Sequence, residues 1–134
     1  MFREDFVWGV ASSAYQVEGT DAADGRGACV WDMFAADGRV FEHQNADTSC
    51  DHMHHYKEDI ALMKHLGIRA YRFSLNWARI LPEGTGRVNE KAIAMYRDMI
   101  LTMKENGITP YLTLFHWEFP QALYERGGWQ NPEI

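Results

Sequence analysis

The sequence predicts an α/β fold in which helices cover a parallel sheet. Two observations carry this prediction. A helix that leads into a short apolar strand occurs twice, and the two copies match 40 residues apart, as Gly67-Ile68-x-x-Tyr71 and Gly107-Ile108-x-x-Tyr111. Short apolar strands that alternate with amphipathic helices are typical of βα units. Such strands form a buried parallel sheet with the helices outside it.

The first strand is expected over residues 6–10, and a long connection follows it from about Ser12 to about Ser49. Connections of this length are usually functional or disordered. Its apolar side chains indicate an ordered loop that packs on the domain, because disordered segments seldom carry them. Those side chains are Trp31, Met33, Phe34, Val40 and Phe41.

The first long helix is expected over residues 56–66, where apolar side chains recur at helical spacing and Gly67 follows as a C-terminal stop. Thr48 or Ser49 is expected to cap the start of this helical region. The second strand is expected over residues 68–75, which are rich in β-forming residues.

The second long helix is expected over residues 93–103, and a third strand over residues 108–115 follows it. Three parallel strands leave both outer edges of a sheet without partners, so the predicted sheet is incomplete. The apolar stripe of the second helix consists of Ile93, Tyr96, Ile100 and Met103.

Composition places residues 1–134 in one globular domain, with 46% hydrophobic and 24% charged residues. A formal charge of −6 disfavours binding to the phosphate backbone of nucleic acid. No apolar stretch approaches the about 20 residues of a membrane span, and the polar first residues do not resemble a signal peptide. Cys29 and Cys50 are expected to be free thiols, which favours a cytoplasmic protein.

Polar and aromatic side chains follow each of the three expected strands. Binding and catalytic residues of parallel α/β folds gather at the carboxyl ends of strands, and this mixture of groups suits a polyhydroxylated ligand. Each residue also has a structural alternative; Arg72, for example, needs a carboxylate partner whether it serves the core or a site. The candidates are Tyr15, Gln16, Glu18, Arg72, Asn76, Trp77, Arg79, His116, Trp117 and Glu118.

A group of histidines and acids resembles a metal site in composition alone. It consists of Asp51, His52, His54, His55 and Glu58. A zinc-binding helix places two histidines four residues apart, whereas these three occupy positions i, i+2 and i+3. A solvated helix face with capping residues is therefore the preferred interpretation over a metal site.

Residues 6–20, FVWGVASSAYQVEGT, resemble the amino-terminal signature of glycoside hydrolase family 1, the family of β-glucosidases and 6-phospho-β-glycosidases. A signature followed by several ordered blocks is specific, and it covers essentially the whole chain. The further blocks are GRGACVWDMF, ADTSCDHMHHYKEDIALMKHLGI, AYRFSLNWARILPEG, LTLFHWEFPQAL and GGWQNPEI.

The resemblance implies that the chain forms the first three βα units of a (β/α)8 barrel, a fold that usually takes about 250 residues. Members of the family are retaining glycosidases. Their acid/base Glu lies in a Thr-x-Asn-Glu-Pro block and their nucleophilic Glu in a Glu-Asn-Gly block near the seventh strand. Neither block is identified in this chain, so no catalytic residue is assigned here.

Site residues follow from the resemblance position by position. Gln16 and His116 match residues that hydrogen-bond the hydroxyls of the non-reducing sugar, and Trp117 matches the indole beside them. Arg72 matches the arginine that contacts the nucleophilic carboxylate and favours its ionised form. The expected ligand is a β-glycoside, and no cofactor or metal ion is expected.

Retaining hydrolysis needs two carboxyl groups about 5 to 5.5 Å apart. Glu18 matches no catalytic position, and neither does Glu118, which replaces the commoner Asp of its block. The chain alone is therefore expected to be inactive and to need the remaining barrel strands on another chain. The alternative is a self-associating, non-catalytic sugar-binding or vestigial module. Other chemistry is disfavoured because the sequence has no phosphate-binding loop and no nucleophile elbow.

Overall fold

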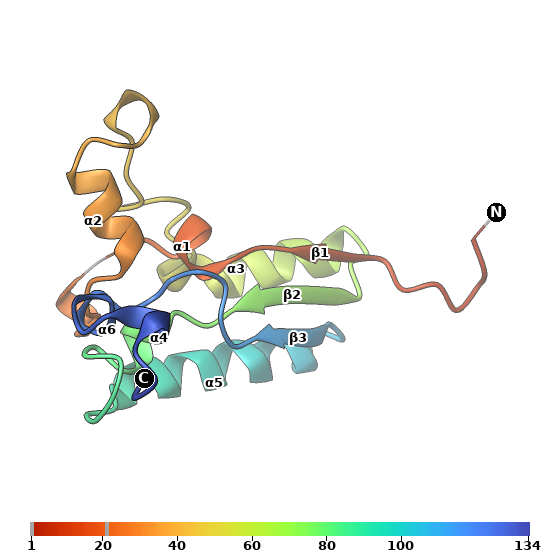
Figure 1. Ribbon diagram of the computed structural model, residues 1–134. Helices are drawn as coiled ribbons and strands as arrows, with labels where there is room; N and C mark the ends of the chain where they lie inside the picture. Colours follow the sequence, from red (N-terminus) through yellow and green to blue (C-terminus); the bar gives the residue numbers. More distant parts are fainter. Residues whose placement is uncertain (1, 21) are drawn as a thin grey trace.

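The computed structural model describes residues 2–20 and 22–134. Its three strands form one parallel sheet in the order β1-β2-β3, and two long helices, α3 and α5, lead into β2 and β3 (Figure 1). The predicted α/β class is confirmed. The strands are β1 (Gly9–Ala11), β2 (Ala70–Ser74) and β3 (Thr109–Thr113), and the helices are α1 (Ala14–Val17), α2 (Val30–Ala36), α3 (His52–His65), α4 (Trp77–Ile80), α5 (Glu90–Glu105) and α6 (Gln121–Glu125), with 3-10 turns η1 (Ala22–Asp24), η2 (Phe41–His43) and η3 (Gly128–Gln130).

Strand β1 begins three residues later than the sequence predicts. Residues before it form an exposed segment in which the Phe6 ring lies 4.5 Å from Phe2 and 4.8 Å from Trp8, between ring centroids. Pairing with β2 starts at Gly9, opposite Ala70. A Cβ atom at Gly9 would lie 2.9 Å from the Ala70 carbonyl oxygen, so only glycine allows this close approach.

Helix α3 starts four residues earlier than predicted, and the predicted cap at Thr48 or Ser49 is wrong. Asp51 precedes the helix with a left-handed backbone, φ 51°, and makes no capping hydrogen bond with its side chain. Ser49 instead donates its hydroxyl hydrogen bond to the carbonyl of Gln16. The helix ends as expected, since Gly67 follows it with φ 76°.

Helix α5 is longer than predicted at both ends and turns a slightly different face to the sheet. Its buried side chains are Ala92, Tyr96, Met99 and Met103. Ile93, assigned to the stripe by sequence, is 40% exposed. The Asn89 side chain caps the helix by accepting a hydrogen bond from the amide of Ala92.

The hydrophobic core lies between the sheet and helices α3 and α5. Tyr71 and Phe73 of β2 point into it, where they join Ile60 of α3 and Met99 and Met103 of α5. Because side chains alternate along a strand, residue 72 between them belongs to the opposite face of the sheet. That face carries no helix in Figure 1.

The outer strands are open, as the sequence predicts. Strand β2 has neighbours on both sides and is buried, whereas every residue of β1 is exposed. On and beside β3, Tyr111 is 54% exposed and Leu114 73% exposed. Within the described residues, no strand pairs with the outer edge of either β1 or β3.

The long connection after β1 is ordered, but its apolar side chains are less buried than predicted. Helix α2 has no fully buried residue, and Phe41 in η2 is 77% exposed. The loop is anchored at Cys29, which forms an antiparallel bridge with Pro120 beyond β3. This bridge brings α2 next to α6 in space (Figure 1).

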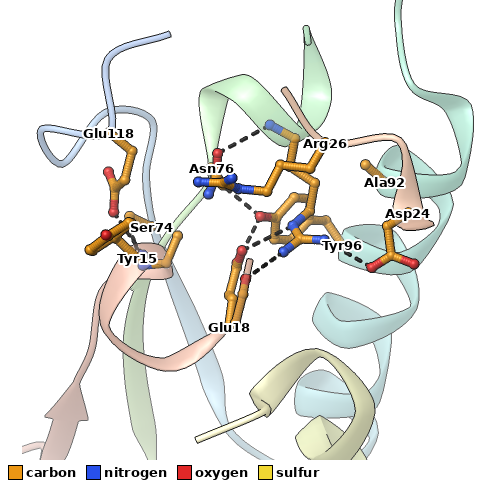
Figure 2. A network of polar contacts seen from close by, with 12 residues as sticks. Tyr15, Glu18, Asp24, Arg26, Ser74, Asn76, Ala92, Tyr96 and Glu118 are labelled. Atoms are coloured by element: carbon orange, nitrogen blue, oxygen red, sulfur yellow. Dashed lines mark hydrogen bonds and ion pairs between the residues drawn. The ribbon is translucent and has the colours of Figure 1, made fainter. Parts of the chain in front are cut away.

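A buried ion network fastens the start of the same connection to helices α4 and α5. Arg79 donates from Nε to Glu18 Oε2 (3.2 Å), from Nη1 to Asp24 Oδ2 (2.9 Å) and from Nη2 to the carbonyl of Gly19 (2.9 Å). Tyr96 adds a hydroxyl hydrogen bond to Glu18 Oε1 at 2.7 Å (Figure 2). The guanidinium group of Arg79 therefore ties residues 18–24 to α4, and Glu18 in turn links them to Tyr96 of α5.

Replacing Arg79→Met should lower the free energy of unfolding by about 3 to 5 kcal/mol, because it leaves the buried Glu18 carboxylate without its cation. Urea denaturation of the full chain measures this change. The control is Arg3→Met, which breaks a shorter ion pair with Asp5 whose side chains are 84% and 68% exposed; it should cost less than about 1 kcal/mol. Equal losses in the two variants would contradict the account.

Candidate functional site

A cavity of about 500 Å3 lies at the carboxyl ends of β1 and β3. We call it the strand-end cavity. Its lining includes Gln16 and His116, the two residues predicted to bind sugar hydroxyls, and Trp117, the predicted indole beside them. The complete lining is Ser13, Tyr15, Gln16, Trp31, Phe34, Arg39, Val40, Phe41, His116, Trp117 and Glu118.

Gln16 reaches the cavity from α1, the short helix that follows β1. Its side chain is exposed, and Oε1 accepts a hydrogen bond from the Ser13 hydroxyl at 2.7 Å. The amide NH2 group has no hydrogen-bond partner among residues 2–20 and 22–134. Because the oxygen is already engaged, Gln16 offers donors to a ligand.

His116 and Trp117 enter the cavity from the loop after β3. Trp117 is 67% exposed and has a left-handed backbone, φ 78°. This conformation is unusual for a bulky side chain and costs about 1 to 3 kcal/mol, and such strain clusters at binding sites. The amide of Phe119 donates to the Trp117 carbonyl at 2.8 Å and closes this tight turn.

Trp117 also borders a second hollow of about 770 Å3, which we call the aromatic hollow. Its rings form a contiguous group, with centroids of Phe119 and Trp129 4.9 Å apart and those of Phe115 and Trp117 6.0 Å apart. Trp31 and Trp117 line both hollows, so the two are adjacent.

Arg72 is not among the residues that line the strand-end cavity. It is half-buried on β2, and its Nε donates to the Thr113 hydroxyl of β3 at 2.9 Å. Within the described part of the chain, no carboxylate lies at ion-pair distance from its guanidinium. The structure thus brings together three of the four predicted site residues, and the role of Arg72 stays a prediction.

Three candidates from the sequence belong to the interior and not to the rim. Glu18, Asn76 and Arg79 are 4%, 1% and 1% exposed. Asn76 caps α4 by accepting a hydrogen bond from the amide of Arg79 at 3.1 Å. Their polarity reflects the buried network that holds the connection after β1, which the sequence does not distinguish from a binding site.

Tyr15, a candidate from the sequence, lines the cavity beside Trp31, with ring centroids 6.3 Å apart. Several further cavity residues come from the long connection and were not assigned to a site from the sequence: Trp31, Phe34, Arg39, Val40 and Phe41. Burial, with a smaller contribution from the Asp32 charge, raises the pKa of Tyr15 to about 12. For Trp31, Phe34, Val40 and Phe41, the only sequence signal was the apolar and aromatic content of the long connection.

Each of the three histidines at the start of α3 bonds a nearby carboxylate. His52 is buried and bonds Asp59 at 2.5 Å, while His54 and His55 pair with Asp51 and Glu58 on the surface. The expectation of a fully solvated group is wrong for His52, which lies against the Tyr71 ring in the core. Among residues 2–20 and 22–134, no group of three or more His, Cys, Asp or Glu side chains has the arrangement of a metal site.

The two cysteines are free thiols, as predicted, with Cys29 buried and Cys50 exposed. Burial raises the pKa of Cys29 to about 11, so its thiol is unreactive at neutral pH. In the described residues, no helix has the length and apolar character to cross a membrane.

No Glu-Asn-Gly block was identified from the sequence, but the chain contains this tripeptide once, before β3. Glu105-Asn106-Gly107 has the letters of the nucleophile block. The structure places Glu105 at the end of α5, just before β3 begins at Thr109. It therefore lies at the amino ends of the strands, opposite the strand-end cavity, and its exposed side chain does not serve as the nucleophile.

Comparison with known proteins gives consistent matches over the whole chain. The model of the family described as "Glycosyl hydrolase family 1" matches residues 1–134. Beta-glucosidase A of Thermotoga maritima is 50% identical over 134 residues, which are 99% of this chain and 30% of that protein. Beta-glucosidase A of Acetivibrio thermocellus is 47% identical over 131 residues, which are 97% of this chain and 29% of that protein.

The fold matches as well as the sequence. The solved structure of the family 1 β-glucosidase from Thermotoga maritima superposes with a TM-score of 0.95 at 50% identity, covering 99% of this chain and 31% of that chain. This chain thus spans less than a third of the length of these relatives. Its three strands coincide with part of a (β/α)8 barrel.

The buried network beside the cavity predicts a pH dependence of stability. Burial raises the pKa of Glu18 to about 7 from 4.5, against the opposing effects of the Arg79 charge and the Tyr96 hydroxyl. Between these values the native state holds a proton that the unfolded chain has lost, so this contribution is present below pH 4.5 and is lost as the pH rises through 7.

Glu18→Gln should remove this dependence. Urea unfolding of the wild type between pH 5 and pH 7 should show an excess uptake of up to about one proton on folding relative to the variant. Parallel curves of unfolding free energy against pH for the two proteins would contradict the assignment.

Proposed function

We propose, starting from the fact that this chain belongs to glycosyl hydrolase family 1, that it supplies the glycone-binding part of a retaining β-glucosidase that acts in carbohydrate metabolism. The observation that carries the proposal is the convergence of Gln16, His116 and Trp117 on one cavity. These residues come from two different strand ends that are 100 residues apart in sequence.

The cavity offers the groups that a hexose requires. The NH2 group of Gln16 donates to a hydroxyl oxygen, and the His116 ring supplies a donor on one nitrogen and an acceptor on the other. The exposed indole of Trp117 provides an apolar face for the C–H side of the sugar ring. A volume of about 500 Å3 accommodates one or two sugar units.

Arg72 is proposed to orient the nucleophile of the complete site. It stands on the helix-free face of β2, which corresponds to the interior of a closed barrel. A half-buried guanidinium that lacks a carboxylate partner is costly unless another segment supplies one. A carboxylate placed beside it would be held in its ionised form, as a nucleophile requires.

Catalysis is proposed to need a second polypeptide segment. Glu118 is the one acid among the described residues that line the cavity, and its side chain is 1% exposed. A retaining mechanism needs two carboxyl groups about 5 to 5.5 Å apart on either side of the glycosidic bond. The open edges of β1 and β3 are the surfaces where the remaining barrel strands would pair.

The second candidate is a self-associating, non-catalytic sugar-binding or vestigial module. The exposed apolar side chains beside β3, such as Leu112 and Leu114, and the unpaired edge of β1 favour contact between copies. We further propose a cytoplasmic location, which is supported by the two free thiols.

A complementation assay tests the leading proposal. The full chain is mixed with a polypeptide that carries the remaining five strands of the Thermotoga maritima relative, and hydrolysis of an aryl β-glucoside is followed. The mixture should be active and each part alone inactive. Hydrolysis by the chain alone that is abolished by Glu18→Gln or Glu118→Gln would contradict the proposal.

Cavity variants locate the binding groups in the same assay. Gln16→Ala and His116→Ala should each lower kcat/KM about tenfold, the effect of one lost hydrogen bond. Gln121→Ala is the control, because Gln121 bonds Glu125 on the surface outside the cavity. Loss of activity in the control equal to that in the cavity variants would argue against the assignment.

Sedimentation velocity separates the two candidates. The leading proposal predicts that the chain at micromolar concentration forms a one-to-one complex with the complementing polypeptide. The alternative predicts a concentration-dependent series of homo-oligomers that does not exchange for that polypeptide. A monodisperse monomer would contradict the self-associating module.

A further inference from the structure

Glu118 is a buried acid that the proposed sugar contacts do not use. It follows Trp117 directly and is 1% exposed, and no Arg, Lys or His among the described residues lies within ion-pair distance of it. Oε1 accepts a hydrogen bond from the backbone amide of Tyr15 at 3.0 Å, while Oε2 is buried without a partner in the described chain (Figure 2). Burying a carboxylate in this way is costly.

The contact to Tyr15 has a counterpart one residue earlier. The Ser74 hydroxyl, at the end of β2, accepts a hydrogen bond from the amide of Ala14 at 2.7 Å. Two consecutive amides at the start of α1 are therefore held by side chains from β2 and from the loop after β3. Figure 2 shows Ser74 and Glu118 on the same side of the Tyr15 backbone.

These contacts fix the backbone that carries Gln16. Tyr15 precedes Gln16 directly, and Glu118 lies two residues after His116, so the Tyr15–Glu118 hydrogen bond is the shortest link between the two hydroxyl-binding side chains. No hydrogen bond joins the side chains of Gln16 and His116 themselves in the described chain.

We propose that Glu118 is a positioning residue that sets the separation of Gln16 and His116, so that both reach hydroxyls of one sugar ring. Glu118 is 1% exposed and its Oε2 atom is buried, so the role assigned to it acts through the backbone of Tyr15 and not through a bond to the ligand. The statement about the sugar depends on the proposed function, whereas the statement about the separation does not.

The separation is measured directly by pulsed electron spin resonance. Spin labels are attached at Gln16→Cys and His116→Cys in a Cys50→Ser background, which leaves the buried Cys29. With Glu118 present, the distance distribution should be single and narrow. Glu118→Met removes the acceptor at nearly the same volume and should broaden or shift the distribution, whereas Glu118→Gln keeps an oxygen acceptor and should restore it.

A matched control separates positioning from stability. Tyr56→Phe removes the hydrogen bond from Tyr56 to Asp98 between α3 and α5, far from the cavity, and should leave the distribution unchanged. If Glu118→Met fails to fold by circular dichroism, Glu118→Ala, which also removes the acceptor, replaces it and should also broaden or shift the distribution. An unchanged distribution in a folded Glu118→Met or Glu118→Ala variant would overturn the proposal.

Sugar binding provides the second readout. In the unlabelled complemented complex, Glu118→Met should raise the Kd for methyl β-glucoside about tenfold, and Tyr56→Phe should not change it. Equal affinities in wild type and Glu118→Met would overturn the role in sugar recognition. A wild-type complex that does not bind the glucoside would instead overturn the proposed function, while the distance result would still decide the role of Glu118 in the fold.

Discussion

Parallel pairing of β1, β2 and β3 is the constraint on which the site depends. Because the three strands run in one direction, the segments that follow β1 and β3 meet at the same edge of the sheet. Gln16 and His116 therefore reach one cavity from opposite ends of the chain. The same pairing leaves the outer edges of β1 and β3 open in the described chain, and these are the edges where the proposed function places further strands.

Hydrogen bonds and ion pairs of buried side chains fix the segments at the carboxyl ends of the strands. Arg79 binds Glu18, Asp24 and the Gly19 carbonyl and so holds the start of the long connection against α4, the helix after β2. Glu118 and Ser74 then hold the start of α1. Burying a polar group without a hydrogen-bond partner costs free energy. The bonds from Ser74 and Glu118 to the start of α1 therefore allow few alternative positions for Gln16.

Helical periodicity and glycine stops predicted α3, α5 and their strands, since local apolar patterning decides these elements. The start of α3 was mispredicted because Asp51 adopts a left-handed backbone that no local pattern reveals. Family resemblance singled out Gln16, His116 and Trp117, and the structure brings these three to one cavity. It could not show that Arg79 and Asn76 are interior, or that Glu118 bonds the Tyr15 amide, because these depend on tertiary contacts between distant segments.

The central claim is that the strand-end cavity, and not the neighbouring aromatic hollow, receives the sugar. Titration of the 15N-labelled chain with methyl β-glucoside, followed by NMR, tests it most directly. We expect chemical-shift changes at the side chains of Gln16, His116 and Trp117, with Trp129 unaffected. Changes confined to Trp129 and the other rings of the aromatic hollow, or no changes at millimolar glucoside, would contradict the account.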